Sequence, residues 1–380
     1  MNRSKIDFCS AADEVCARLD SLGGYVNPEE VAPLKGAAAH EVAVGPVHAG
    51  VIEPGHFRFQ CMGEDVYNLQ IFLGYQHRGV EEAVVAADGN LPRQIALAET
   101  CAGDTSAAAA IAFAELMECA FPERFSAPNA EDLRLRALLL ELERIANHVG
   151  DLGALAGDVA FLQSASFCGR IRGEYLNMTA LVCGNRFGRN AIAPGGARAG
   201  LSDRICAELK ARIGRVKPEL DRALKLMFHD HSVCDRFDGT GKVPKEVARE
   251  IGLVGVARRA SEEFNGDVMA RALVRRVEIN EAHVRIARIL DGGVPDGSES
   301  AKTADGKDRF RVVAAAVSAW RGDLVHAAAF SPEGKMLRYK IVDPSARNWP
   351  GLARALRGEQ ISNFPICNKS FNLSYCGTDR

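Results

Sequence analysis

The chain has 380 residues, of which 47% are hydrophobic and 25% charged, and its formal net charge is −2 at pH 7. These values are typical of a soluble globular protein, and the length allows one large domain or two ordinary ones. A nearly neutral chain gives no electrostatic reason to bind nucleic acid or an anionic membrane surface. We therefore expect no nucleic-acid partner.

The 11 cysteines are spread over the chain without a Cys-x-x-Cys pair. The N-terminus is polar and lacks the apolar core of a signal peptide, so we expect the chain to stay inside the cell with its thiols reduced. Residues 312–330 form the longest apolar stretch, and Arg321 and Asp323 interrupt it. We therefore expect any membrane association to run through partner subunits.

Two small units are predicted before the helical part of the chain. Residues 1–36 read as a helical lead-in that ends at a Gly-Gly break, because the apolar residues Ile6, Ala12, Val15, Leu19 and Leu22 recur at helical spacing. Over residues 37–76, apolar and polar residues alternate with a period of two, and turn signals stand at residues 53–55 and 63–65. This pattern predicts a small antiparallel β-unit.

Helical periodicity predominates over residues 77–308, which predicts a multi-helix bundle. We expect long helices over residues 107–120, 131–150, 161–187, 201–228 and 261–290. The second of these also carries Glu141, Arg144, His148 and Asp151 at spacings of three or four, which brings side chains together on a helix. This row is either part of a site or an ordinary solvated or structural row, and the second is the commoner case.

The period returns to two residues at the C-terminal end. Residues 310–319, 323–330 and 335–342 read as strands, the last two joined by a Ser-Pro-Glu-Gly turn. The expected fold class is therefore α+β, with a central helical bundle, a small N-terminal antiparallel β-unit and a C-terminal β-rich segment over residues 309–380. Residues 37–380 would form one domain.

The segments LGYQHRGVE (residues 73–81), AETCAGDTS (98–106) and FNLSYCGTDR (371–380) stand out because polar groups alternate with small residues. They resemble RGxE, ERICGxCS and DPCxSCTDR of the nickel-iron hydrogenase large subunit. The likeness is to the membrane-bound, energy-converting (group 4) branch, which is related to the 49 kDa (D) subunit of NADH:quinone oxidoreductase. Two further segments, residues 252–261 and 320–352, extend the resemblance over residues 40–380.

In that family, two Cys-x-x-Cys pairs hold the nickel-iron centre, because soft thiolates suit these metals. Aligned with the family segments, the four ligand positions of this chain are Ala102, Thr105, Ser374 and Gly377. Cys101 and Cys376 each lie one residue away, which turns a side chain by about 100° on a helix. The resemblance therefore implies a relative without a nickel-iron centre and with no cofactor on this chain. Cys101 and Cys376 could form a disulfide or a mononuclear site, but two buried neutral thiols are the default.

Glu81 matches the family glutamate that relays protons beside the centre. With His77 and Arg78 in reach, a carboxylate in a nearly dry pocket can still move protons. The alternative is that Arg78 and Glu81 form a structural pair at a helix start.

Other candidate sites have weaker patterns. His229, His231 and Cys234 are metal-ligand types without a fourth ligand nearby, so we expect a capping and turn role. The Gly-rich loops at residues 195–196 and 239–241 lack the strand-loop-helix context of a nucleotide site. The segment GPVHAGVIEPGHFRF lacks the second histidine that the NADH dehydrogenase version places near quinone, so quinone binding stays possible without a motif of its own.

The resemblance implies a subunit of a membrane-associated, energy-converting oxidoreductase complex at the cytoplasmic face of the inner membrane. Its expected partners are an iron-sulfur small subunit, with a cluster near residues 99–106 and 371–380, and integral membrane ion-translocating subunits. The alternatives are a quinone-reducing subunit of a NADH dehydrogenase-like complex and a scaffold without chemistry. Because the chain ends where mature hydrogenase subunits end, we expect that it needs no metal-triggered processing.

Overall fold

The computed structural model describes residues 16–17, 19, 24–29, 31–36, 38–294, 301–304 and 310–380. Most of the predicted lead-in helix of residues 1–36 lies outside these residues. Of its described part, Leu19 is buried against Ala327 and Ala329. The division of the chain into a lead-in and one large domain stays a prediction.

The N-terminal β-unit is a three-stranded antiparallel sheet of β1 (Ala39–Val44), β2 (His56–Met62) and β3 (Asp65–Phe72), in that order. The two-residue period places Phe57, Phe59 and Cys61 on one fully buried face. The turn between β2 and β3 uses Gly63, whose φ of 61° favours glycine. This face packs against the C-terminal segment of the chain, as described below.

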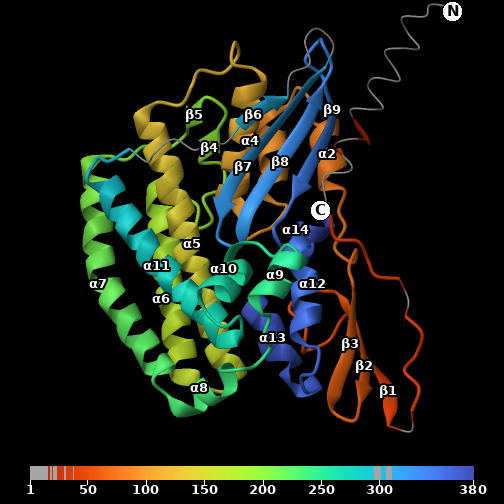
Figure 1. Ribbon diagram of the computed structural model, residues 1–380. Coiled ribbons are helices and arrows are strands. Elements are labelled where there is room, and N and C mark those ends of the chain that lie inside the picture. The colour runs from red at the N-terminus through yellow and green to blue at the C-terminus, as the bar shows by residue number, and fades with distance from the viewer. Residues whose placement is uncertain are drawn as a thin grey trace, which may run out of the picture.

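The helices follow in chain order (Figure 1). They are α2 (Val80–Ala86), α3 (Leu91–Glu99), α4 (Ser106–Ala120), α5 (Ala130–Asp158), α6 (Leu162–Cys183), α7 (Asp203–Phe228), α8 (His231–Phe237), α9 (Lys245–Glu250), α10 (Gly255–Glu263) and α11 (Val268–Leu290). The long helices α5, α6, α7 and α11 lie side by side, and α5 touches both α6 and α11. A capping box at Asn129 and Asp132 fixes the start of α5.

The helix predicted over residues 261–290 is wrong at its start, because α10 ends at Glu263 and α11 begins at Val268. Gly266 has a φ of 81°, and a Cβ there would overlap the Val243 carbonyl. Asp267 then caps α11 by accepting a hydrogen bond of 2.7 Å from the Ala270 N–H. An Asn-Gly-Asp run therefore ends one helix and starts the next.

The C-terminal sheet consists of β6 (Ala301–Ala304), β7 (Arg311–Ala319), β8 (Gly322–Phe330) and β9 (Met336–Val342), all antiparallel neighbours in this order. Helix α4 packs on β7 and β8, and α2 packs on β9. A short hairpin of β4 (Ile192–Ala193) and β5 (Gly196–Ala197) lies near α4. Three helices close the chain: α12 (Ser345–Ala355), α13 (Phe364–Phe371) and α14 (Tyr375–Asp379). The predicted mixture of helices and strands is confirmed, and in the described part of the chain no helix is long and apolar enough to cross a membrane.

An aromatic cluster joins the N-terminal sheet to the C-terminal helices. The ring of Trp349 in α12 is fully buried and meets Tyr375 of α14 edge to face at 4.8 Å. The Trp349 Nε1 donates a hydrogen bond of 3.0 Å to the Thr378 hydroxyl. The ring centroids of Trp349 and of Phe57 in β2 lie 6.4 Å apart. The cluster therefore fixes α14 against the sheet.

We expect Trp349→Ala to lower the free energy of unfolding by about 3–5 kcal/mol, because it opens a cavity and removes a buried hydrogen bond. Chemical denaturation measures this change. The matched control is Phe264→Ala, whose ring is 40% exposed and whose loss should cost much less. Equal effects of the two substitutions would contradict this packing.

Candidate functional site

The segment that precedes α2 lies against the end of the chain. The Asp379 carboxylate accepts hydrogen bonds of 2.8 Å from the Gly74 and Gln76 N–H groups. His77 Nδ1 donates to the Asp379 carbonyl at 2.8 Å, and the Arg78 N–H donates to the Arg380 carbonyl at 3.2 Å. Two motifs about 300 residues apart in sequence therefore form one site.

Glu81 lies in the first turn of α2 and is only 8% exposed. Its Oε1 accepts a hydrogen bond of 2.8 Å from the Ile341 N–H, and two cations, Lys340 Nζ and Arg380 Nη1, each lie 3.4 Å from its oxygens. The structure thus gives a buried carboxylate two positive partners, both from the C-terminal part of the chain.

The predicted pair of Arg78 and Glu81 is wrong. The Arg78 guanidinium donates instead to the Thr100 and Cys101 carbonyls, at 3.0 and 2.8 Å. These carbonyls follow the end of α3, where helix carbonyls lack partners and attract a cation. His77 also points elsewhere, since its ring bonds to the Asp379 backbone.

Three of the four positions that match metal ligands are held by other contacts, and the fourth, Ala102, has a side chain that cannot bind a metal. The Thr105 hydroxyl donates to Asp104 Oδ1 at 3.0 Å, and Ser374 Oγ caps α14 by accepting from the Gly377 N–H at 2.9 Å. A Cβ built on Gly377 would overlap the Asp343 carboxylate and lie 2.7 Å from Ser374 Oγ. A cysteine at position 377 would therefore displace Asp343.

The space beside Ala102 and Thr105 is also small. A cavity lined by Cys101, Ala102, Thr105 and Asp343 has a volume of about 10 Å³, which is roughly the room that one water molecule needs. Within the described residues, no group of three or more His, Cys, Asp or Glu side chains is arranged to hold a metal ion. Neither the donor set nor the space fits a nickel-iron centre.

Cys101 and Cys376 are both free thiols, so the structure forms no disulfide between them. Burial raises the pKa of the Cys101 thiol, and burial together with Glu53 raises that of Cys376. Both are therefore protonated at neutral pH and poor nucleophiles or metal ligands.

Arg321 connects this site to the rest of the fold. Its Nη1 and Nη2 donate to the two oxygens of Asp104, both at 2.8 Å, and its Nε donates to the Asn372 carbonyl at 2.7 Å. The guanidinium stacks 3.9 Å from the Trp320 ring, whose Nε1 donates to the Asp104 carbonyl. Burial by itself raises the pKa of Asp104. The Arg321 guanidinium outweighs this effect and holds the pKa of Asp104 below its usual value.

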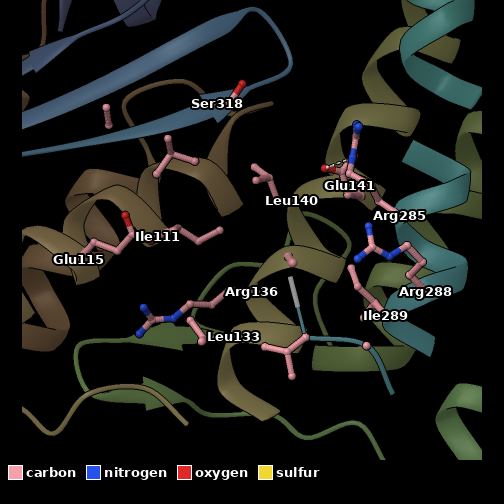
Figure 2. A pocket seen from close by; sticks show the side chains of 15 residues that line it. Ile111, Glu115, Leu133, Arg136, Leu140, Glu141, Arg285, Arg288, Ile289 and Ser318 are labelled. Atoms are coloured by element: carbon pink, nitrogen blue, oxygen red, sulfur yellow. Dashed lines mark hydrogen bonds and ion pairs between the residues drawn. The ribbon is translucent and has the colours of Figure 1, made fainter. Parts of the chain in front are cut away.

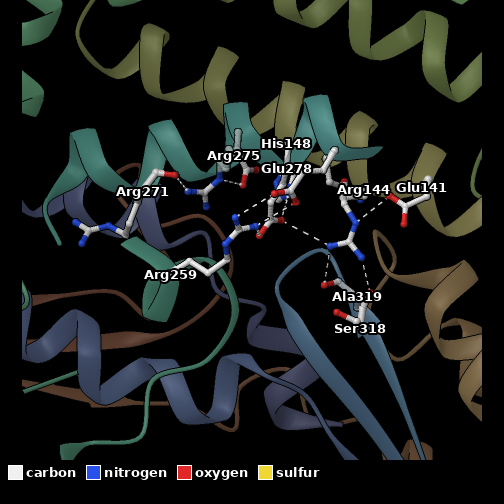
Figure 3. A network of polar contacts seen from close by, with 12 residues as sticks. Glu141, Arg144, His148, Arg259, Arg271, Arg275, Glu278, Ser318 and Ala319 are labelled. Atoms are coloured by element: carbon white, nitrogen blue, oxygen red, sulfur yellow. Dashed lines mark hydrogen bonds and ion pairs between the residues drawn. The ribbon is translucent and has the colours of Figure 1, made fainter. Parts of the chain in front are cut away.

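The polar row of α5 is a buried network rather than a solvated face (Figure 3). Its four members, Glu141, Arg144, His148 and Asp151, are all buried. His148 Nε2 lies 2.7 Å from Glu278 of α11, which also accepts from Arg259 Nη1 at 3.1 Å. Arg144 donates to the Ser318 and Ala319 carbonyls at 2.5 and 3.2 Å. The network therefore ties α5, α10 and α11 to the end of β7.

Glu278 was not among the predicted site residues. The signal was present in α11, where Arg271, Arg275 and Glu278 recur at helical spacing on a face that is otherwise apolar. Arg275 Nε donates to Asp151 at 2.7 Å, and Asn372 Nδ2 donates to the other oxygen of Asp151 at 2.5 Å. Asn372 thus links this network to Arg321.

The larger cavities lie away from Glu81. One of about 360 Å³ opens between α4, α5, α11 and β7, with an apolar lining that includes Ile111, Leu133, Leu140 and Ile289 (Figure 2). A second, of about 400 Å³, lies beside the Arg144–Glu278 network and reaches Trp320. Glu81 lines neither of them.

The His229–Cys234 segment has the geometry of a helix start. His229 Nδ1 donates to the Lys225 carbonyl at 2.9 Å, and the Cys234 thiol bonds to the Phe228 carbonyl at 3.4 Å. Between them Asp230 caps α8 by accepting from the Ser232 and Val233 N–H groups. His229 and Cys234 are thus used locally, and His231 is an exposed residue in the first turn of α8.

We expect Glu278→Gln to lower the free energy of unfolding by about 3–5 kcal/mol, because it leaves buried cations without their partner. Although burial raises it, His148 and the arginines lower the pKa of Glu278 from 4.5 to about 2. A lowered pKa stabilises the fold above pH 4.5, and this stability is lost as the pH falls toward 2. Denaturation between about pH 7 and pH 2 should show this loss in the wild type and a smaller one in the variant. The control is Glu281→Gln, because the Glu281 side chain is half-exposed. If stability depended on pH in Glu278→Gln as it does in the wild type, this would count against the network.

Known proteins with similar sequences are named as hydrogenase or formate hydrogenlyase components and as NADH-quinone oxidoreductase subunits. The family model of the respiratory-chain NADH dehydrogenase 49 Kd subunit matches residues 158–263. Hydrogenase-4 component G of Escherichia coli is 25% identical over 90% of this chain. Formate hydrogenlyase subunit 5 of the same organism is 26% identical over 89% of it. NADH-quinone oxidoreductase subunit 4 of Thermus thermophilus is 29% identical over 70% of this chain and 69% of its own length.

The chain spans 62% and 63% of the length of the two Escherichia coli relatives. Among solved structures, a chain of an archaeal respiratory complex, the membrane-bound sulfane sulfur reductase, matches with a TM-score of 0.74 and 22% identity. The match covers 90% of this chain and 99% of that one, and it shows a shared fold. The sequence and the fold together show that the chain is homologous to membrane-bound hydrogenase subunits and to the 49 kDa (D) subunit of NADH dehydrogenase, as its motifs predict.

Proposed function

We propose that this chain is the large-subunit-like component of an energy-converting, hydrogenase-related oxidoreductase complex, and that it works without a nickel-iron centre of its own. It couples electron transfer from a partner iron-sulfur subunit to the movement of protons or ions. The observation that carries this proposal is the contrast between Glu81, which is present in a buried site, and the four metal positions, none of which is a cysteine and three of which are held by other contacts. Retention of the carboxylate without the metal ligands favours proton transfer over hydrogen cleavage.

The surroundings of Glu81 support a proton-carrying role. Lys340 and Arg380 balance its charge, and the Ile341 N–H fixes the direction of one oxygen. A carboxylate within hydrogen-bond reach of a group that bears protons can exchange a proton with it, and the Lys340 ammonium is such a group. His77 and Arg78 serve this site by fixing the loop before α2 and the end of α3.

The proposed partners follow from the position of the site. Residues 98–106 and 371–380 form the wall that faces an iron-sulfur cluster on the small subunit, in the arrangement of a hydrogenase large subunit. Integral membrane subunits carry the ion-translocating part and hold the chain at the cytoplasmic face of the inner membrane. Several relatives are named as subunits of membrane-bound or respiratory complexes, which supports this assignment.

A quinone-reducing subunit of a NADH dehydrogenase-like complex is the second candidate, and the likeness to the Thermus thermophilus subunit favours it. In that case NAD and quinone would be substrates of the whole complex. The cavity at Cys101 and Thr105, of about 10 Å³, is too small for a quinone headgroup. The larger cavities do not reach Glu81, so the proton-coupling proposal explains the site better than quinone binding does.

We expect Glu81→Gln to lower turnover of the purified complex at least tenfold, since an amide keeps the shape but carries no exchangeable acid proton. Co-purification of the partner subunits and the melting temperature check that the complex still assembles. Glu82→Gln is the matched control, because Glu82 is the exposed neighbour on the same helix turn. Full turnover in an assembled Glu81→Gln complex would exclude Glu81 from the mechanism.

A further inference from the structure

The small cavity beside the former metal positions has polar groups on several sides. Cys101 and Thr105 line it from the segment that leads into α4, and His326 and Asp343 line it from the sheet and the turn that follows β9. Its volume of about 10 Å³ matches one water molecule. A water in such a space needs two to four polar partners, and these residues supply them.

His326 is the group that most needs such a partner. The ring is fully buried in β8, and its Nδ1 shares a hydrogen bond of 2.7 Å with the Tyr339 hydroxyl of β9. Its Nε2 is buried and has no hydrogen-bond partner in the described parts of the chain. Burial lowers the pKa of His326 to about 3, so the neutral ring has one donor and one acceptor nitrogen. A buried ring nitrogen is costly to leave unpaired, and it lies in a residue that lines the cavity.

The other polar groups of the cavity are already oriented. The Thr105 hydroxyl bonds to Asp104 Oδ1 at 3.0 Å and keeps acceptor capacity toward a water. Asp343 Oδ1 accepts from the Ser345 N–H at 2.7 Å, and burial raises the pKa of its carboxyl. Asp343 is therefore a better proton acceptor than Asp104, which Arg321 holds ionised.

We propose that this cavity binds one water molecule, held by His326 Nε2, the Thr105 hydroxyl and the Asp343 carboxylate. The proposal stands on the cavity, on the unpaired ring nitrogen and on the polar side chains that line the cavity. It is independent of the function proposed for Glu81.

The water site is tested by a structure of the complex at about 2 Å resolution or better. We expect one density peak within about 3.2 Å of His326 Nε2 and of an Asp343 oxygen. In Ala102→Ser, the added hydroxyl should take the place of this peak. An empty cavity, or a direct hydrogen bond from Nε2 to another protein group, would overturn the water site.

Discussion

The ion pair between Arg321 and Asp104 is the interaction on which the site depends. Asp104 lies just before α4, Arg321 lies in the turn between β7 and β8, and the carbonyl that accepts from Arg321 Nε belongs to Asn372 at the end of α13. One guanidinium thus joins the segment that leads into α4, the C-terminal sheet and the C-terminal segment. Loss of either charge would leave the other without its partner in a largely buried place, which is among the more costly changes a fold can suffer.

Such contacts take the structural role that a metal centre would have. Four thiolates on two segments would bind the N-terminal and C-terminal motifs to a shared cluster. Here Asp379 binds the backbone of residues 74–76, Arg380 reaches Glu81, and the Ser345 hydroxyl accepts from the Ser374 N–H at 2.9 Å. Hydrogen bonds and ion pairs hold the same two segments together, and they leave the buried carboxylates in place.

Local sequence signals predicted the elements better than the contacts of the site. The β-unit and strands β7, β8 and β9 follow from two-residue periodicity. Strand β6 lies in the stretch predicted to be helical, so that prediction is wrong there. The prediction of one helix over residues 261–290 disregards the Asn265-Gly266-Asp267 run, in which Gly266 makes the turn and Asp267 caps α11. The motif search identified Glu81, but its partners Lys340 and Arg380 lie about 260 and 300 residues away, where spacing gives no information. His326 and Glu278 looked like ordinary residues of a strand and a helix, since their role depends on which neighbours the fold brings to them.

The central claim, that this chain works without a nickel-iron centre, is tested most directly by metal analysis with infrared spectroscopy. The sample is the full chain purified together with its iron-sulfur partner. The account predicts iron and sulfide from the partner, no stoichiometric nickel, and no carbonyl or cyanide bands of a hydrogenase centre. Nickel in stoichiometric amount together with those bands would contradict it, because the contacts at Thr105, Ser374 and Gly377 leave no place for such a centre.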